Sequence, residues 1–268
     1  MSATNVTDGT SETVRREVVD GVGIVSMNRP DKHNALNNEL SRAMHQGLEW
    51  ALSDPAVRVL LLRGEGKSFT SGRDTTQLGT RDPGVSDYHF VLDSQKAKLQ
   101  LLDSTKPIVV AMKGFALGGG LELALGGDIR VAATDIRIGF PEVRFGIMTD
   151  TGGMPYTTML AGPSRAKYLV MTGDLIGADQ ALAWGLVDFV YEPDQVDEEA
   201  LKLAKRLAAG PPLSLAMIKQ TVDGMWAGAI RQGLQAELLG QCTLFKSQDY
   251  QEARAALLEK RPATYTGT

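Results

Sequence analysis

The stretch Lys113-Gly-Phe-Ala-Leu-Gly-Gly-Gly-Leu-Glu-Leu-Ala-Leu-Gly-Gly-Asp128 is the part of the sequence around which the rest of the chain is organised. An apolar run, Pro107 to Met112, precedes it and predicts a strand, and Leu121 to Leu125 predicts the start of a buried helix. Three glycines at this junction permit positive φ and a close approach by backbone or ligand, because no Cβ stands in the way. The first N–H groups of the helix point outward unpaired, so this turn can hold a partly negative oxygen.

One acid, Glu122, follows the glycines and is flanked by apolar residues. Burial among them would raise its pKa, which suits a group that transfers protons. Alternatively, the glycines only permit close strand-to-helix packing, and Glu122 points to solvent. A glycine-rich turn does not by itself decide between the two interpretations.

Length and composition describe an ordinary globular protein. The 268 residues can bury a full core, as one large domain or as one domain with an appendage. The net charge is −4 and the basic residues are scattered, so we expect no nucleic-acid partner. One cysteine, Cys242, and three histidines exclude an internal disulfide and a dense metal site, and they favour a reduced, cytoplasmic location.

Neither the N-terminal residues nor the apolar runs have the pattern of a targeting or membrane-spanning segment. Residues 1–13 are polar and lack the pattern of a signal peptide, so we expect a flexible N-terminus. The longest apolar runs are far too short to span a bilayer, and we therefore expect no membrane partner.

Predicted strands and helices alternate up to Tyr191, which is typical of an α/β fold with parallel pairing. Asp20-Gly21 separates two valine-rich runs and predicts a hairpin. Asn37 is a candidate cap for the helix that follows. The predicted strands are 14–19, 22–27, 57–63, 107–112, 129–133, 136–140 and 187–191, and residues 145–153 are predicted as a loop.

After a boundary near Glu192 to Gln195 the sequence is mostly helical, from Val196 to Lys260, with breaks at Gly210-Pro-Pro212 and near Ser247. We therefore expect three regions: the N-terminus, 1–13; an α/β core, 14–194; and a C-terminal helical region, 195–268.

Five segments, in this order, resemble the crotonase (enoyl-CoA hydratase/isomerase) superfamily, and its enoyl-CoA hydratases in particular. They are Asn28-Arg-Pro-Asp-Lys-His-Asn-Ala-Leu36, Ser68-Phe-Thr-Ser-Gly-Arg-Asp74, Gly114-Phe-Ala-Leu-Gly-Gly-Gly-Leu-Glu-Leu123, Gly139-Phe-Pro-Glu-Val143 and Glu252 to Arg261. The resemblance implies a spiral of ββα turns with a C-terminal helical trimerisation region. It also implies a homotrimer or a dimer of trimers.

The ligand that this resemblance implies is an acyl-CoA thioester, with no cofactor beyond the coenzyme A of the substrate. Family members hold the thioester oxygen in an oxyanion hole of two backbone N–H groups, which fall here on Arg73 and Gly119. The Arg73 side chain is then free to narrow the pocket or to meet a CoA phosphate. The substrate-binding residues implied by the resemblance are Lys32, Ser71, Gly72, Arg73, Asp74, Thr75, Gly118 and Gly119.

Glu122 and Glu142 match the two catalytic glutamates of enoyl-CoA hydratases. Addition of water across a 2-enoyl thioester needs one carboxylate to take a proton from water and a second acid to protonate the α-carbon. We assign Glu122 to the water and Glu142 to the α-carbon. Two acids also argue against a non-catalytic acyl-CoA binding protein, because binding alone has no use for them.

Asp150 departs from the hydratase pattern, since Thr149-Asp-Thr-Gly-Gly153 stands where typical hydratases carry Pro-Gly-Ala-Gly-Gly. It is either a helix N-cap or a third catalytic carboxylate. Some enoyl- and dienoyl-CoA isomerases use an Asp here as a proton shuttle, and carnitinyl-CoA dehydratases carry a similar segment together with both glutamates. Isomerisation and a carnitinyl-CoA dehydratase-like reaction are therefore the alternatives to hydration.

Overall fold

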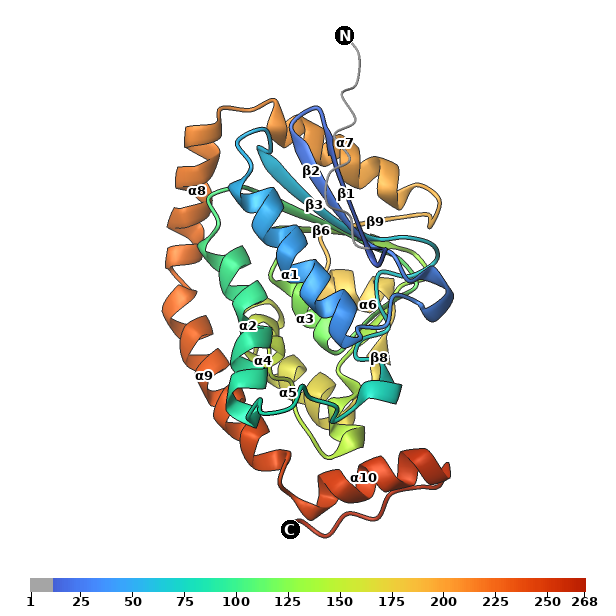
Figure 1. Ribbon diagram of the computed structural model, residues 1–268. Coiled ribbons are helices and arrows are strands. Elements are labelled where there is room, and N and C mark those ends of the chain that lie inside the picture. Colours follow the sequence, from blue (N-terminus) through green and yellow to red (C-terminus); the bar gives the residue numbers. More distant parts are fainter. Residues whose placement is uncertain (1–11) are drawn as a thin grey trace.

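The computed structural model describes residues 12–268, so most of the predicted flexible N-terminus, residues 1–11, lies outside the described part. Its main feature is a six-stranded sheet in the order β1-β2-β3-β4-β6-β9 (Figure 1). The first two strands are antiparallel and the others pair in parallel. The strands are β1 (Val14–Val19), β2 (Val22–Met27), β3 (Val59–Gly64), β4 (Ile108–Met112), β6 (Ile129–Ala133) and β9 (Phe189–Tyr191).

The hairpin between β1 and β2 is formed as the sequence predicts. Val19 pairs with Val22, and both turn residues have positive φ, 51° at Asp20 and 79° at Gly21. Aspartate and glycine are among the residues that adopt this conformation most readily, which is why the dipeptide specifies the turn. Asn37 is likewise the cap of α1 (Asn38–Ser53), where its side chain accepts a hydrogen bond from the Leu40 N–H.

A second, three-stranded sheet contains β5 (Phe115–Leu117), β7 (Arg137–Gly139) and β8 (Leu175–Ile176). The chain passes from β4 to β5 and then into α3 (Gly119–Leu125). It repeats this path from β6 to β7 and, through η3 (Pro141–Phe145), into α4 (Gly153–Ala161). Each turn adds one strand to each sheet before a helix, so the expected α/β spiral of ββα turns is confirmed.

The two faces of the large sheet are covered by different helices (Figure 1). On one face lies α7 (Val196–Ala208), whose buried small residues repeat every four positions and allow close packing on the strands. On the other lie α1, α2 (Asp87–Asp103) and α3, which share a larger apolar core with the strands. This second side also contains the cavity described below.

The C-terminal helices extend along the side of this second layer. They are α8 (Pro212–Gly224), α9 (Ala227–Leu244) and α10 (Gln248–Glu259), and α9 packs along α2 and α4 while α10 contacts η3 (Figure 1). The remaining elements are η1 (Pro30–Lys32), η2 (Thr75–Gln77), α5 (Pro163–Thr172) and α6 (Ala178–Ala183). The helical C-terminal region is thus present, whereas its separation from a core ending at residue 194 remains a prediction.

Several element boundaries differ from the prediction. The strand expected at 136–140 covers only Arg137–Gly139, and the one expected at 187–191 begins at Phe189. The sequence pattern does not predict α4, because its glycine, proline and threonines are weak helix formers. The helix after residue 212 also has a break that was not predicted, at Met225 and Trp226.

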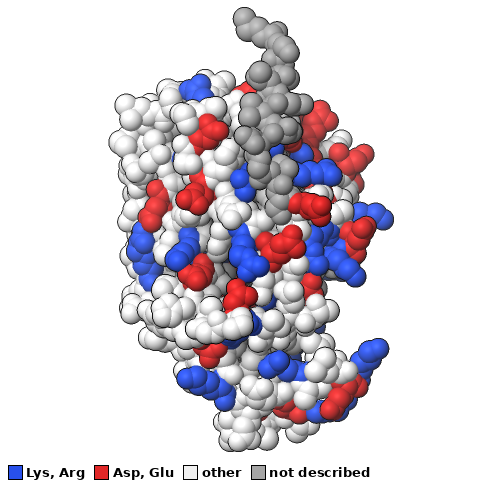
Figure 2. All heavy atoms as spheres, viewed as in Figure 1, with Lys and Arg blue, Asp and Glu red and all other residues white. Residues whose placement is uncertain are grey.

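On the face seen in Figure 2, charged side chains lie in small groups. Figure 2 shows Lys and Arg interspersed with Asp and Glu on the face in view. None of the helices within residues 12–268 combines the length and apolar character needed to cross a membrane.

Candidate active site

A cavity of about 170 Å³ lies among α1, α2, α3, η3 and the C-terminal helices. All three predicted catalytic carboxylates line it, as do both residues of the predicted oxyanion hole. Apolar side chains form much of the remaining wall. The charged and titratable residues that line the cavity are His45, Arg73, Arg81, Lys98, Glu122, Glu142, Asp150 and Tyr250.

Glu122 is fixed at the N-terminus of α4. Its side chain is buried, and Oε1 accepts hydrogen bonds from the N–H groups of Thr151 and Gly153, each at 2.9 Å. Oε2 accepts a third from the Thr151 hydroxyl, also at 2.9 Å. The interpretation in which Glu122 points to solvent is therefore wrong, because its carboxyl group is enclosed and both oxygens accept hydrogen bonds.

A second carboxylate, Glu237 of α9, caps the same helix end. It is 1% exposed and accepts from Gly152 N–H at 2.6 Å, Met154 N–H at 2.9 Å and Thr149 Oγ1 at 2.8 Å. Burial first, and then the charge of Glu122, raise the pKa of Glu237 to about 8. Sequence reasoning missed this residue. The available signal was its place beside Leu234 and Leu238 on the buried face of a helix.

Glu142 follows Pro141 in η3, and its Oε2 is buried without a hydrogen-bond partner. Burial, with Glu122 as the next cause, raises its pKa well above the ordinary value, so its carboxyl group holds a proton to higher pH. Gly118, at φ 51°, makes room for it: a Cβ there would lie 2.3 Å from Glu142 Oε1. The first glycine of the triplet therefore fixes the place of this carboxyl group.

Asp150 points into the same cavity, where its Oδ2 accepts a hydrogen bond from Gln241 Nε2 at 3.3 Å. Burial, followed by the charge of Glu122, raises its pKa to about 7. The N-cap of α4 is Gly152, with no capping bond from its own side chain. The helix-cap interpretation of Asp150 is therefore wrong, because Glu122 and Glu237 supply that capping.

The backbone N–H groups of Arg73 and Gly119 both belong to cavity-lining residues. Within residues 12–268 neither N–H donates to an acceptor of the protein. The Arg73 side chain narrows the cavity and bonds to Asn38 Oδ1 at 2.5 Å and to the Gln77 carbonyl at 3.2 Å. Its guanidinium is thus held by the protein's own acceptors, and burial lowers its pKa.

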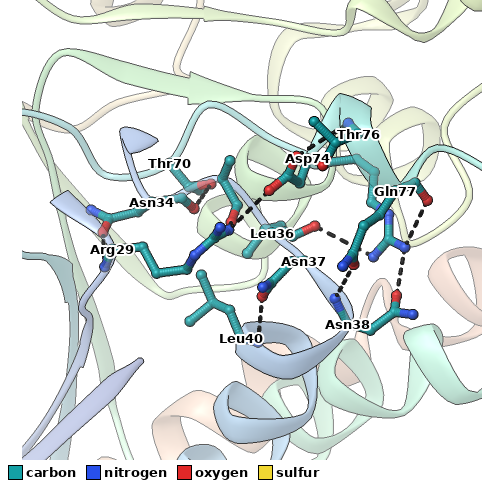
Figure 3. A network of polar contacts seen from close by, with 12 residues as sticks. Arg29, Asn34, Leu36, Asn37, Asn38, Leu40, Thr70, Asp74, Thr76 and Gln77 are labelled. Carbon is teal, nitrogen blue, oxygen red and sulfur yellow. Dashed lines mark hydrogen bonds and ion pairs between the residues drawn. The ribbon is translucent and has the colours of Figure 1, made fainter. Parts of the chain in front are cut away.

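A polar network ties the loop that carries Arg73 to the segment before α1 (Figure 3). Arg29 Nη1 bonds to Asp74 Oδ2 at 3.1 Å, and the Thr70 hydroxyl donates to the Asn34 carbonyl at 2.7 Å. Asp74 is also the N-cap of η2, and its side chain accepts a hydrogen bond from the backbone N–H of Thr76. These bonds fix the direction in which the Arg73 N–H points.

The other predicted substrate-binding residues are not among those that line the cavity. Lys32 is exposed on η1, and Ser71, Gly72, Asp74 and Thr75 lie in the network loop. Gly72, at φ 85°, is needed for close packing, since a Cβ would lie 2.7 Å from the Leu117 carbonyl oxygen. Their binding of substrate stays a prediction.

Lys98 of α2 is a further cavity residue that sequence reasoning missed. It is 4% exposed, and among the described residues it has neither a hydrogen-bond acceptor nor an ion-pair partner. Burial lowers its pKa to about 8, while Glu122 and Asp150 act in the opposite direction. The signal was a lysine between Ala97 and Leu101 on the buried face of a helix.

Together these groups can move two protons beside one polarised oxygen. Glu122, whose carboxyl group is positioned by three donors, can accept a proton, and Glu142, with its raised pKa, can give one. The unpaired N–H groups of Arg73 and Gly119 can bind negative charge that develops on a carbonyl oxygen.

The chain is similar to known proteins along most of its length. Residues 17–268 match the family described as Enoyl-CoA hydratase/isomerase. Crotonyl-CoA hydratase of Syntrophomonas wolfei subsp. wolfei is 34% identical over 95% of this chain and 98% of its own. The 1,2-epoxyphenylacetyl-CoA isomerase of Escherichia coli is 31% identical over 96% and 99%. Carnitinyl-CoA hydratase from Mycobacterium avium superposes with a TM-score of 0.83 at 30% identity, over 97% of this chain and 100% of that one.

Proposed function

The chain belongs to the enoyl-CoA hydratase/isomerase family, and we propose that it is an enoyl-CoA hydratase that adds water reversibly across the double bond of a 2-enoyl-CoA thioester. One observation carries the proposal. Glu122 and Glu142 line the same cavity as the two unpaired N–H groups of Arg73 and Gly119. A hydratase needs these groups, and an acyl-CoA carrier does not.

In the proposed reaction Glu122 takes a proton from water, and the hydroxyl oxygen forms a bond to the β-carbon. The electron pair of the double bond moves towards the thioester, whose oxygen gains charge and is held by the N–H groups of Arg73 and Gly119. Glu142 then gives its proton to the α-carbon. One water is consumed, and proton exchange with solvent restores both carboxyl groups.

The test is turnover of crotonyl-CoA by the purified protein, followed as loss of enoyl-thioester absorbance. We expect hydration without added metal or redox cofactor, because two carboxyl groups and two N–H groups supply every required proton and charge. A chelator should leave the rate unchanged. Inert protein, or strict dependence on a divalent ion, would contradict the proposal.

Asp150 favours one second candidate, migration of the substrate double bond. Its carboxyl group lies in the cavity and is not the α4 cap, and its pKa of about 7 suits proton transfer in either direction. Asp150→Asn keeps the size of the side chain and an acceptor for Gln241. We expect it to lower turnover of the best substrate by about 10²-fold with little change in Tm. Unchanged turnover would contradict a catalytic role for Asp150 and would leave hydration by Glu122 and Glu142 as the proposed function.

We also propose that the protein assembles as a trimer or a dimer of trimers through its C-terminal helices. Large apolar side chains are exposed on α8 and just before α9, where they repeat at helical spacing. They are Leu213, Met217, Ile218, Val222, Met225 and Trp226. Sedimentation should give a trimer or a hexamer, and a monomer at micromolar concentration would refute this proposal.

A further inference from the structure

Arg81 is held rigidly in the cavity wall. Its guanidinium contacts the rings of Phe90 and Phe245, 4.3 and 4.2 Å from their centroids, and Nε donates to Asp87 Oδ1 at 2.8 Å. These two ring contacts and the bond to Asp87 hold the guanidinium in place. The two terminal nitrogens have no acceptor within the described part of the chain. They are donors without a partner in a side chain that is only 14% exposed.

Tyr250 lies beside this stack and also lacks a partner. Its ring is tilted against Phe245, with the centroids 5.3 Å apart. The residue is 2% exposed, lines the cavity, and has a buried hydroxyl without any hydrogen-bond partner. A buried hydroxyl left unpaired is unfavourable, so an acceptor supplied by a ligand would satisfy it.

The surrounding charges favour an anion at this place. Against the larger effect of burial, three cations, Arg254, Arg81 and Arg73, lower the pKa of the Tyr250 hydroxyl through their charge. Asp87 is the one acid among the charged residues with the largest effect on this pKa. Asp87 is already bonded to Arg81 through Nε. Arg81 and Tyr250 both contact Phe245 and line the same cavity, and a carboxylate accepts from arginine in a bidentate manner.

We propose that Arg81 and Tyr250 form a carboxylate-binding subsite, and that the preferred substrate is an enoyl-CoA whose acyl chain ends in a second acid group. This inference rests on the proposed function and names its substrate class. The subsite belongs to the same cavity as Glu122 and Glu142, where the acyl part of the thioester must lie for reaction. A phosphate of coenzyme A is the other source of an anion, and the experiment separates the two.

The experiment measures dissociation constants for saturated thioesters, which have no double bond to hydrate. Butyryl-CoA is compared with the mono-CoA thioester of a saturated dicarboxylic acid, on wild type, Tyr250→Phe and Arg81→Met. We expect wild type to bind the dicarboxylic thioester about 10-fold or more tightly than it binds butyryl-CoA. The affinity for the dicarboxylic thioester should fall roughly 10-fold in Tyr250→Phe and about 10²-fold in Arg81→Met. Butyryl-CoA binding should stay unchanged.

Two controls keep the test selective. Tyr250→Phe removes only a hydroxyl without a partner, so its Tm should not fall. Arg165→Met removes another stacked arginine, which lies over Trp184 and does not line the cavity. This change should alter the dissociation constant of neither ligand.

Equal wild-type affinity for the two thioesters would overturn the subsite and leave the hydratase proposal standing. Equal weakening of both ligands by Arg81→Met, or weaker binding of free coenzyme A, would assign the anion to a CoA phosphate and also overturn it. Failure of both thioesters to bind would overturn the proposed function itself.

Discussion

The two faces of the large sheet have opposite characters. Under α7 the strands contribute a cluster of buried apolar side chains, such as Leu61 and Val109, and the helix adds Val196 and alanines. On the side of α2 and α3 the same sheet supports a cavity with buried acids and a buried lysine, Lys98. The first face stabilises the fold, whereas the second carries charges that are unfavourable to bury and that the proposed chemistry uses.

Two of the buried carboxyl groups on the acidic side are bonded to backbone, which lowers the free-energy cost of their burial. Glu122 and Glu237, from two different helices, both cap α4, where the helix dipole also favours negative charge. Glu142 has no such bond on Oε2. The contrast predicts that changes under α7 affect stability alone, and that changes around Glu142 affect activity.

Among the changes that leave every catalytic side chain in place, Gly118→Ala has the largest expected effect. The new Cβ would displace the Glu142 carboxyl group, and the backbone at φ 51° disfavours alanine. Because a displacement of about 1 Å at a catalytic group can cost about 10²-fold in rate, we expect kcat for crotonyl-CoA to fall by about that factor.

Gly119→Ala is the matched control. Its Cβ would meet nothing closer than 3.6 Å, and the N–H remains. Its kcat should stay within a few-fold of wild type, roughly 1 kcal/mol or less in activation free energy. Equal losses in the two variants would show that the triplet glycines act only through general packing.

On the opposite face, Leu61→Ala should lower the free energy of unfolding by about 2–5 kcal/mol, because Leu61 is fully buried and the residual cavity adds to the lost transfer free energy. Urea denaturation measures this, with the exposed Leu258→Ala as control. The kcat of the folded Leu61→Ala protein should equal that of wild type. A lower kcat would contradict the separation of the two faces.

The smallest expected effect is the pH dependence of stability. The folded pKa values of Asp150 and Glu237, about 7 and about 8, are raised above their unfolded values near 4. Their contribution to stability is therefore fully present below about pH 4 and is lost as pH rises through 7 and 8, by on the order of 1 kcal/mol or more.

Urea denaturation at pH 5 and pH 8 measures this loss. Glu237→Gln removes one of the two titrating groups, so the fall in unfolding free energy between these pH values should be smaller than in wild type. Identical falls would contradict the assigned burial of Glu237.

Local sequence signals predicted the parts of the fold that depend on local chemistry. The Asp20-Gly21 turn and the Asn37 cap are set by residues a few positions apart, and both are confirmed. The α4 helix was not predicted because its capping groups come from far along the chain, Glu122 and Glu237. No local pattern contains that information.

The candidate site shows the same limit. Glu122, Glu142 and Asp150 could be named through a resemblance, and the structure brings them to one cavity. Lys98 and Glu237 could not, because a charged residue in an amphipathic helix normally faces water. Only the packing of α9 against α2 and α4 shows that these two side chains are enclosed.

The central claim, that Glu122 and Glu142 divide the two proton transfers, is tested most directly by comparing hydration with α-proton exchange. Exchange of the α-protons of butyryl-CoA with deuterated solvent needs a group at the α-carbon and the oxyanion hole, but no activated water. Glu122→Gln and Glu142→Gln should each lower crotonyl-CoA hydration by about 10²-fold or more. Exchange should persist in Glu122→Gln and disappear in Glu142→Gln. Near wild-type hydration in either variant, or exchange retained by Glu142→Gln, would contradict the account.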